Sequence, residues 1–184
     1  MVSKAGSSDE LGTTASLGGS FPGRLACMLI CAQHGSTEPD SLSLGRLRVG
    51  SGGNMKFYFT VPVWGNNHID LFTNVGLPSL LSPGNIPGLR DVGQCRFFIH
   101  TFPEDEARLA GSRSVERLSR LMPVEIRLIR SPVISPYRTM SDCHKEIMRL
   151  ADANNLPTVF PSPDHVWSDG SMARMEQIAE LVRR

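Results

Sequence analysis

Two carboxylates and an imidazole lie close together near the C-terminus of the chain. The segment "FPSPDHVWSDGS", residues 160–171, contains Asp164, His165 and Asp169. A short apolar run precedes it, and a helix-like pattern follows it. Carboxylate oxygens bind divalent cations such as Mg²⁺ or Mn²⁺, and an imidazole can bind a metal or transfer a proton. This spacing therefore predicts a site for metal-assisted or acid–base chemistry.

Each of these side chains also has an ordinary structural explanation. Asp169 could cap the last helix or stand beside its capping residue, because Asp is common before an apolar-periodic run. Asp164 follows a proline, and Pro-Asp pairs are frequent in turns. His165 could be a surface residue of the loop, while His100 and His144 could be packing residues beside the core. The sequence alone leaves these alternatives open.

The composition argues against several kinds of partner and location. The 184 residues include 19 basic and 18 acidic side chains, which is too even a balance for a nucleic-acid groove. The longest apolar run near the N-terminus, "LACMLICA", is too short to span a bilayer, and a long Gly/Ser-rich stretch before it is unlike a signal peptide. The four cysteines do not form a disulfide framework, so we expect free thiols and a cytoplasmic location.

The chain changes character at Met55. Residues 1–54 are rich in Gly and Ser and contain Phe21 as their only aromatic side chain. Such a segment buries too little apolar surface to offset the entropy of ordering, so we predict a disordered extension. Residues 55–184 alternate between strand-like and helix-like patterns and are predicted to form one α/β domain.

The elements of this domain are expected to alternate between strand and helix. The predicted strands are "MKFYFTVPVW", "CRFFIHTF", "MPVEIRLI" and "PTVF". Alternation of this kind predicts a mostly parallel, Rossmann-like sheet with helices on both faces. Ligands of such sheets bind outside the carboxyl ends of the strands, which is where residues 160–171 are expected.

Helix boundaries are predicted from capping and breaking residues. Asn67 is a candidate N-cap for the first helix, which Gly76 and Pro78 should kink or split. Gly111 should break the helix that follows the second strand. Thr139 and Asp142 resemble a capping box at the start of the next helix. The chain has none of the strong phosphate-binding or metal-binding motifs, such as a P-loop or His-Glu-x-x-His.

From Met55 onward the chain resembles the donor-binding half of a GT-A-fold glycosyltransferase, in the nucleotide-diphospho-sugar transferase superfamily. The resemblance lies in four stretches, "FYFTVPVWGNNHIDLF", "LPSLLSPGNIPGL", "FFIHTFPEDEARL" and "FPSPDHVWSDGSMARM". The first is similar to the strand, turn and helix that receive the nucleotide. The last is similar to the strand that ends in an acidic metal-binding motif.

The resemblance implies that this part of the chain binds a nucleotide sugar. Val61, Pro62 and Val63 would contact the nucleoside, and Thr101 would lie near the base. His144 is assigned to the same binding site.

The resemblance also implies a divalent metal, Mg²⁺ or Mn²⁺, that bridges the diphosphate. Asp164 would occupy the last position of the family's acid-x-acid motif and bind this metal. Ser162 stands in place of the first acid, which would weaken metal binding unless His165 or water substitutes for it. We therefore expect a single protein carboxylate at this site.

Family members continue beyond the helix that follows the fourth strand, with strands that build the acceptor site. The resemblance therefore implies a donor-binding half that is incomplete for hexosyl transfer and could self-associate through an uncovered sheet edge. Two alternatives remain open. The chain could be a non-catalytic α/β interaction module, or a phosphate-ester hydrolase that uses Asp164, although the second acid of such a site is absent.

Overall fold

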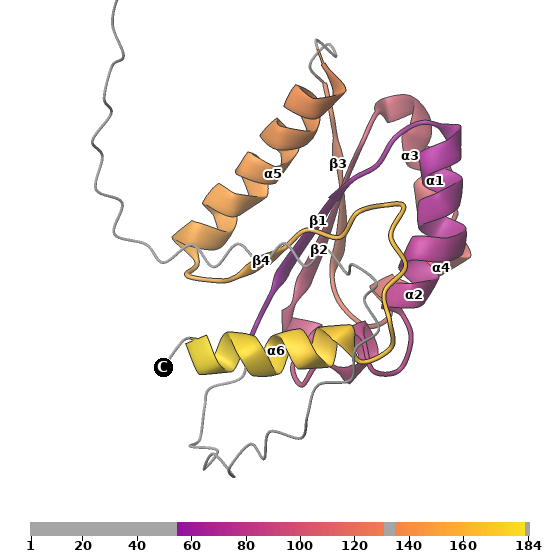
Figure 1. The fold of residues 1–184 in the computed structure, drawn as a ribbon. Coiled ribbons are helices and arrows are strands. Elements are labelled where there is room, and N and C mark those ends of the chain that lie inside the picture. Colours follow the sequence, from indigo (N-terminus) through magenta and orange to yellow (C-terminus); the bar gives the residue numbers. More distant parts are fainter. Residues whose placement is uncertain (1–54, 131–134, 183–184) are drawn as a thin grey trace, which may run out of the picture.

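Four parallel strands form one sheet at the centre of the molecule (Figure 1). The structure is a computed structural model that describes residues 55–130 and 135–182, so the predicted disorder of residues 1–54 lies outside the described residues. In sequence order the strands are β1 (Tyr58–Pro62), β2 (Arg96–Thr101), β3 (Val124–Leu128) and β4 (Thr158–Val159). The prediction of an α/β fold with a parallel sheet is confirmed.

The strands lie in the order β3-β2-β1-β4, which reverses direction next to β1. The chain runs outward from β1 to β2 and β3, and then returns to place β4 on the other side of β1. Such a reversal creates a crevice at the carboxyl ends of the two strands between which the order reverses, here β1 and the edge strand β4, and this place is the switch point of the sheet. The candidate loop, residues 160–170, begins at this switch point.

β1 extends beyond the end of its neighbour β4. β4 pairs only with Tyr58 and Phe59, so the second half of β1 has no β4 partner. The Tyr58 N–H donates to Pro157 O on the β4 side, and the Val63 N–H donates to His100 O on the β2 side. Successive N–H groups of a strand point alternately to its two neighbours, so the backbone nitrogen of residue 62 points to the β4 side, as that of residue 58 does. The pairing with β4 has ended before residue 62, so Pro62 loses no hydrogen bond of the sheet there.

The helices follow the strands much as the sequence predicts. An unbroken helical stretch after β1 consists of α1 (Asn66–Leu71), a π-helical turn η1 (Phe72–Gly76) and α2 (Leu77–Leu80), so the irregularity expected at Gly76 is present as a π-turn. Gly111 separates α3 (Pro103–Ala110) from α4 (Arg113–Ser119), as predicted. The remaining elements are α5 (Pro136–Ala153), α6 (Ser171–Val182) and two short 3-10 turns, η2 (Ile86–Gly88) and η3 (Val92–Gln94).

Two of the predicted helix starts are wrong. The N-cap of α1 is Gly65 and not Asn67, because a left-handed φ of 76° at Gly65 turns the chain two residues earlier. The helix α5 begins at Pro136, ahead of the Thr139–Asp142 pair, because proline presets the φ angle of a first helical turn. Within the described ranges, no helix has the length and apolar character required to cross a membrane.

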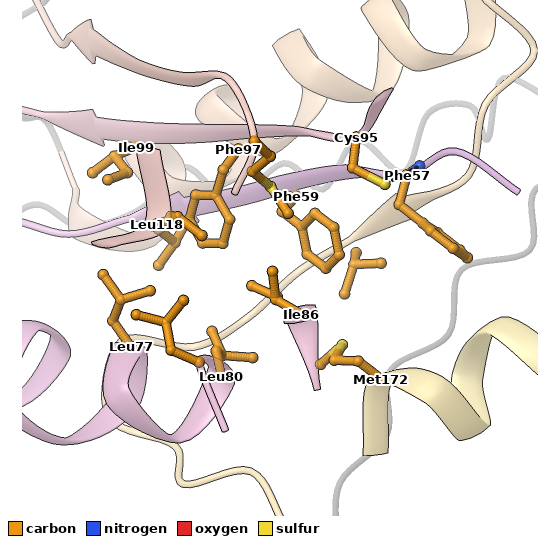
Figure 2. Packing of buried hydrophobic residues seen from close by; sticks show 14 of the residues in the cluster. Phe57, Phe59, Leu77, Leu80, Ile86, Cys95, Phe97, Ile99, Leu118 and Met172 are labelled. Carbon is orange, nitrogen blue, oxygen red and sulfur yellow. Dashed lines mark hydrogen bonds between the residues drawn. The ribbon is translucent and has the colours of Figure 1, made fainter. Parts of the chain in front are cut away.

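The two faces of the sheet are covered unequally. The larger core lies on the face covered by α1, α2, α3, α4 and α6, and Figure 2 shows sheet side chains opposite residues from α2, α4, α6 and η2. On the other face, α5 packs against Tyr58 and Phe98 through Ile147 and Ala151. Of the helices that the structure describes, α5 alone covers this face (Figure 1). The larger core is centred on Phe57, Phe59, Phe97, Ile99, Leu77, Leu80, Ile86, Leu118 and Met172.

Candidate ligand site at the carboxyl edge of the sheet

The loop after β1 is joined to the segment after β2. Gly65 has a φ of 76°, and its N–H donates to Asp105 Oδ2 at 2.7 Å, which ties the start of α1 to α3. The rings of Trp64 and Phe102 stand edge to face with centroids 5.5 Å apart. Trp64 is the second residue after β1, Phe102 is the first residue after β2, and both are partly exposed. They therefore form a rigid aromatic pair at the carboxyl edge of β1 and β2.

The loop after β4 is packed closely on the helices that follow β1. A Cβ atom added at Gly76 would meet Pro163 O at 2.8 Å, so the backbone of the loop lies directly on η1. Further along, the Trp167 N–H donates to Ser79 Oγ at 3.0 Å. These contacts hold the loop over α1, η1 and α2, with Asp164 between its two fixed points.

Asp169 holds a second loop in place and does not cap α6. Its Oδ1 accepts the N–H of Gly84 at 2.6 Å. The first turn of α6 is capped from that second loop, because the Met172 N–H donates to Asn85 Oδ1 at 3.1 Å and the Ala173 N–H donates to Gly84 O at 3.3 Å. Asp169 does stand beside the residue that precedes α6, but its carboxylate serves the contact between the two loops.

Asp164 presents an exposed, ionised carboxylate at the carboxyl edge. The Ser162 hydroxyl donates to Asp164 Oδ1, and this hydrogen bond, with smaller effects of His165 and His68, lowers the pKa of the carboxyl below its ordinary value. No group of three His, Cys, Asp or Glu side chains in the described ranges is placed to hold a metal ion. Of the side chains in this hydrogen bond, Asp164 contributes one carboxylate and Ser162 one hydroxyl.

The residues predicted to contact the nucleoside are buried. Val61 and Val63 are 0% and 1% exposed and belong to the larger core, so only backbone atoms there could meet a ligand. Pro62 is buried at the end of β1. Thr101 is fully buried at the end of β2, and its Oγ1 has no hydrogen-bond partner in the part of the chain that the structure describes.

His144 lies against the first residue after β4. Its ring stands edge to face with Phe160, with centroids 4.7 Å apart, and burial lowers the pKa of His144 below its ordinary value. A neutral, half-buried imidazole therefore lies beside the switch point. Two apolar side chains in the first turns of α5, before His144, are exposed: Met140 by 38% and Tyr137 by 78%. These side chains leave the first turns of α5 as an uncovered apolar surface.

A polar cluster on the α5 face was not predicted from the sequence. His100 is 2% exposed at the end of β2, and its Nδ1 lies 4.0 Å from Glu146 Oε2 of α5. Arg127 of β3 pairs with Glu146 and, at 2.9 Å, with Glu125. His100 is buried as a packing residue would be, but it lies among charged groups. A histidine at the end of an apolar strand was the only signal available in the sequence.

The carboxyl edge therefore carries an aromatic pair and an ionised carboxylate in the segments that follow the strands, and a neutral imidazole on α5. Aromatic rings of this kind can stack on flat ligand groups, and a carboxylate can bind a cation. Comparisons with protein-family models, with curated proteins and with solved structures found no match to this chain.

Proposed function

We propose that this chain binds a nucleoside-diphosphate sugar at the switch point, as the donor-binding part of a GT-A-like glycosyltransferase. The observation that carries the proposal is the strand order β3-β2-β1-β4, with Asp164 on the loop that leaves β4. In open parallel sheets this position receives nucleotides. The sequence resemblance supports the same assignment independently.

The charge of Asp164 determines how a diphosphate could bind there. An ionised carboxylate repels a diphosphate, so the two can share a site only with a divalent cation between them. Mg²⁺ and Mn²⁺ accept one or two protein oxygens together with phosphate oxygens and water, which agrees with the pair of Asp164 and Ser162. When bound, the cation would stabilise the departing nucleoside diphosphate as a Lewis acid.

The aromatic pair is suited to the nucleoside. Trp64 and Phe102 are partly exposed and fixed against each other, so a base could stack on them without reordering the protein. The neighbouring backbone of Val63 and Gly65 could supply hydrogen-bonding groups, in keeping with the burial of the Val63 side chain. His144 would line the opposite side of the site, next to Phe160.

Calorimetric titration of the full chain tests the proposal. UDP, GDP, UDP-glucose and GDP-mannose are titrated with and without Mn²⁺. We expect Mn²⁺ to raise the affinity for at least one of these ligands by about tenfold, equivalent to about 1.4 kcal/mol. The substitution Asp164→Asn should abolish this gain.

Asp152→Asn is the matched control. Asp152 is an exposed carboxylate near the C-terminal end of α5, at the opposite edge of the sheet. The substitution Asp152→Asn should leave the Mn²⁺-dependent gain in nucleotide affinity unchanged. If the wild-type chain binds none of the four nucleotides, the proposal fails. Binding that is equally strong with and without metal would contradict the role of Asp164.

A further inference from the structure

A buried imidazole with a free nitrogen lies at the carboxyl end of β2, on the face that α5 covers. His100 is 2% exposed, and its Nε2 has no hydrogen-bond partner among the described residues. Its register partners are Pro62 in β1 and Arg127 in β3. A buried polar atom without a partner destabilises the fold, so such an atom in a native protein calls for an explanation.

Glu146 lies beside the Nδ1 atom of His100, on the other side of the ring from the free nitrogen. Glu146 Oε2 lies 4.0 Å from His100 Nδ1, and the same carboxylate accepts a hydrogen bond from Arg127 Nη1. A carboxylate beside Nδ1 favours the tautomer that carries its hydrogen there. Burial lowers the pKa of His100 to about 4, against smaller opposing effects of Glu146, so the imidazole is neutral at pH 7. Its Nε2 then carries a lone pair and can accept a hydrogen bond.

A second polar atom without a partner lies on the same face of the sheet. Thr60 Oγ1 is buried and unpaired within the described ranges. Thr60 is paired with Phe98, two residues before His100, and side chains two residues apart in a strand point to the same face. The adjacent strands β1 and β2 thus direct an unpaired hydroxyl and an unpaired imidazole nitrogen toward α5.

The charges around His100 select the kind of group that it can bind. A phosphate or carboxylate is anionic at neutral pH and would be repelled by the Glu146 carboxylate. An ammonium group would have to be buried beside the Arg127 guanidinium. A hydroxyl group is neutral, donates one hydrogen bond and accepts others, so it matches both Nε2 and the Thr60 hydroxyl.

We propose that His100 and Thr60 bind a hydroxyl group of the sugar portion of the ligand, with Glu146 as the residue that positions the imidazole. This inference rests on the proposed function and places the sugar on the α5 side of the switch point. His100 is 2% and Thr60 is 0% exposed, so a ligand hydroxyl would reach them only when side chains of α5, such as the 51% exposed Glu146, move aside.

The test compares each nucleotide sugar with its own nucleoside diphosphate. The full chain is titrated in Mn²⁺ with UDP-glucose against UDP and with GDP-mannose against GDP. We expect one of the sugar nucleotides to bind about three- to tenfold more tightly than its diphosphate, the size of one hydrogen bond. His100→Leu should remove this difference and leave diphosphate binding unchanged. His100→Gln, which retains a hydrogen-bonding group, should keep part of it.

Imidazole NMR of the wild-type chain supplies a second measurement that needs no variant. Long-range ¹H–¹⁵N spectra should show His100 neutral at pH 7, with its hydrogen on Nδ1, and UDP-glucose or GDP-mannose should shift the Nε2 resonance. A hydrogen found on Nε2 would overturn the inference. If the sugar nucleotides bind no better than their diphosphates, the inference about His100 and Thr60 is wrong, but the proposed nucleotide binding is not contradicted. Absence of all nucleotide binding would overturn both.

Discussion

Gly76 lies where the backbone of the loop after β4 packs on η1, so replacing this glycine tests how the candidate site is held. A Cβ atom at Gly76 would stand 2.8 Å from Pro163 O and 3.3 Å from His165 O. Both contacts are backbone atoms, which cannot rotate away as a side chain could. Gly76→Ala must therefore displace the loop segment that carries Asp164.

The expected cost of Gly76→Ala is the difference between two effects. Overpacking of a well-packed contact typically costs about 1–3 kcal/mol. The backbone of Gly76 is helical, with φ −61° and ψ −55°, so alanine regains up to about 1 kcal/mol of helix propensity. We expect a net loss of about 1–2 kcal/mol in the free energy of unfolding, together with a weaker effect of Mn²⁺ on nucleotide affinity.

Gly93→Ala is the matched control for Gly76→Ala. The nearest atom to a Cβ at Gly93 is Leu121 O at 4.0 Å, so the substitution should be neutral or slightly stabilising. Urea unfolding of both variants, followed by circular dichroism, gives the two free energies. If Gly76→Ala proves as stable as Gly93→Ala, the loop after β4 is not seated on η1 and the geometry of the site is wrong.

Three further predictions follow from buried or paired groups. Asp169→Ala removes the acceptor of the Gly84 N–H and should lower the free energy of unfolding by about 1–2 kcal/mol in urea, whereas no loss would show that the loop contact is weak. The folded-state pKa of His100 is about 4, below its ordinary 6.5, so the unfolded chain binds more protons between these values. Stability should therefore fall as the pH drops from 6.5 to 4, by up to about 3 kcal/mol, and an equally steep fall in His100→Gln would refute this. Burial raises the pKa of Cys95 and Cys143 to about 11, so neither thiol should react with iodoacetamide at pH 8 until the chain unfolds, as peptide mass spectrometry can check.

The type of fold follows from local patterns in the sequence. Apolar runs such as "CRFFIHTF" and the helical patterns between them are enough to predict a parallel sheet, since each crossover needs a helix. The irregularity at Gly76 and the break at Gly111 were also predicted, because glycine weakens a helix locally. The order of the strands could not be predicted, because β4 could have paired beside β3 as readily as beside β1 from its two residues alone.

The candidate site was predicted in position but not in its contacts. Asp164 follows a strand, so its place at the carboxyl edge follows from connectivity. The partner of Asp169 is Gly84, 85 residues earlier in the chain, and no local pattern joins the two. Similarly, His100 acquires its environment only when α5 brings Glu146 over the end of β2. Contacts between distant segments depend on how the layers pack, which the sequence pattern does not specify.

Mapping the binding surface by NMR tests the central claim most directly. Amide ¹H–¹⁵N spectra of the full chain are recorded during titration with UDP-glucose and with GDP-mannose in Mg²⁺, which is diamagnetic. We predict that the largest shifts occur at residues 63–66 after β1 and 160–165 after β4, with little change at the opposite edge near residues 152–157. Shifts confined to that opposite edge, or no shifts at saturating nucleotide, would contradict a nucleotide-sugar site at the switch point.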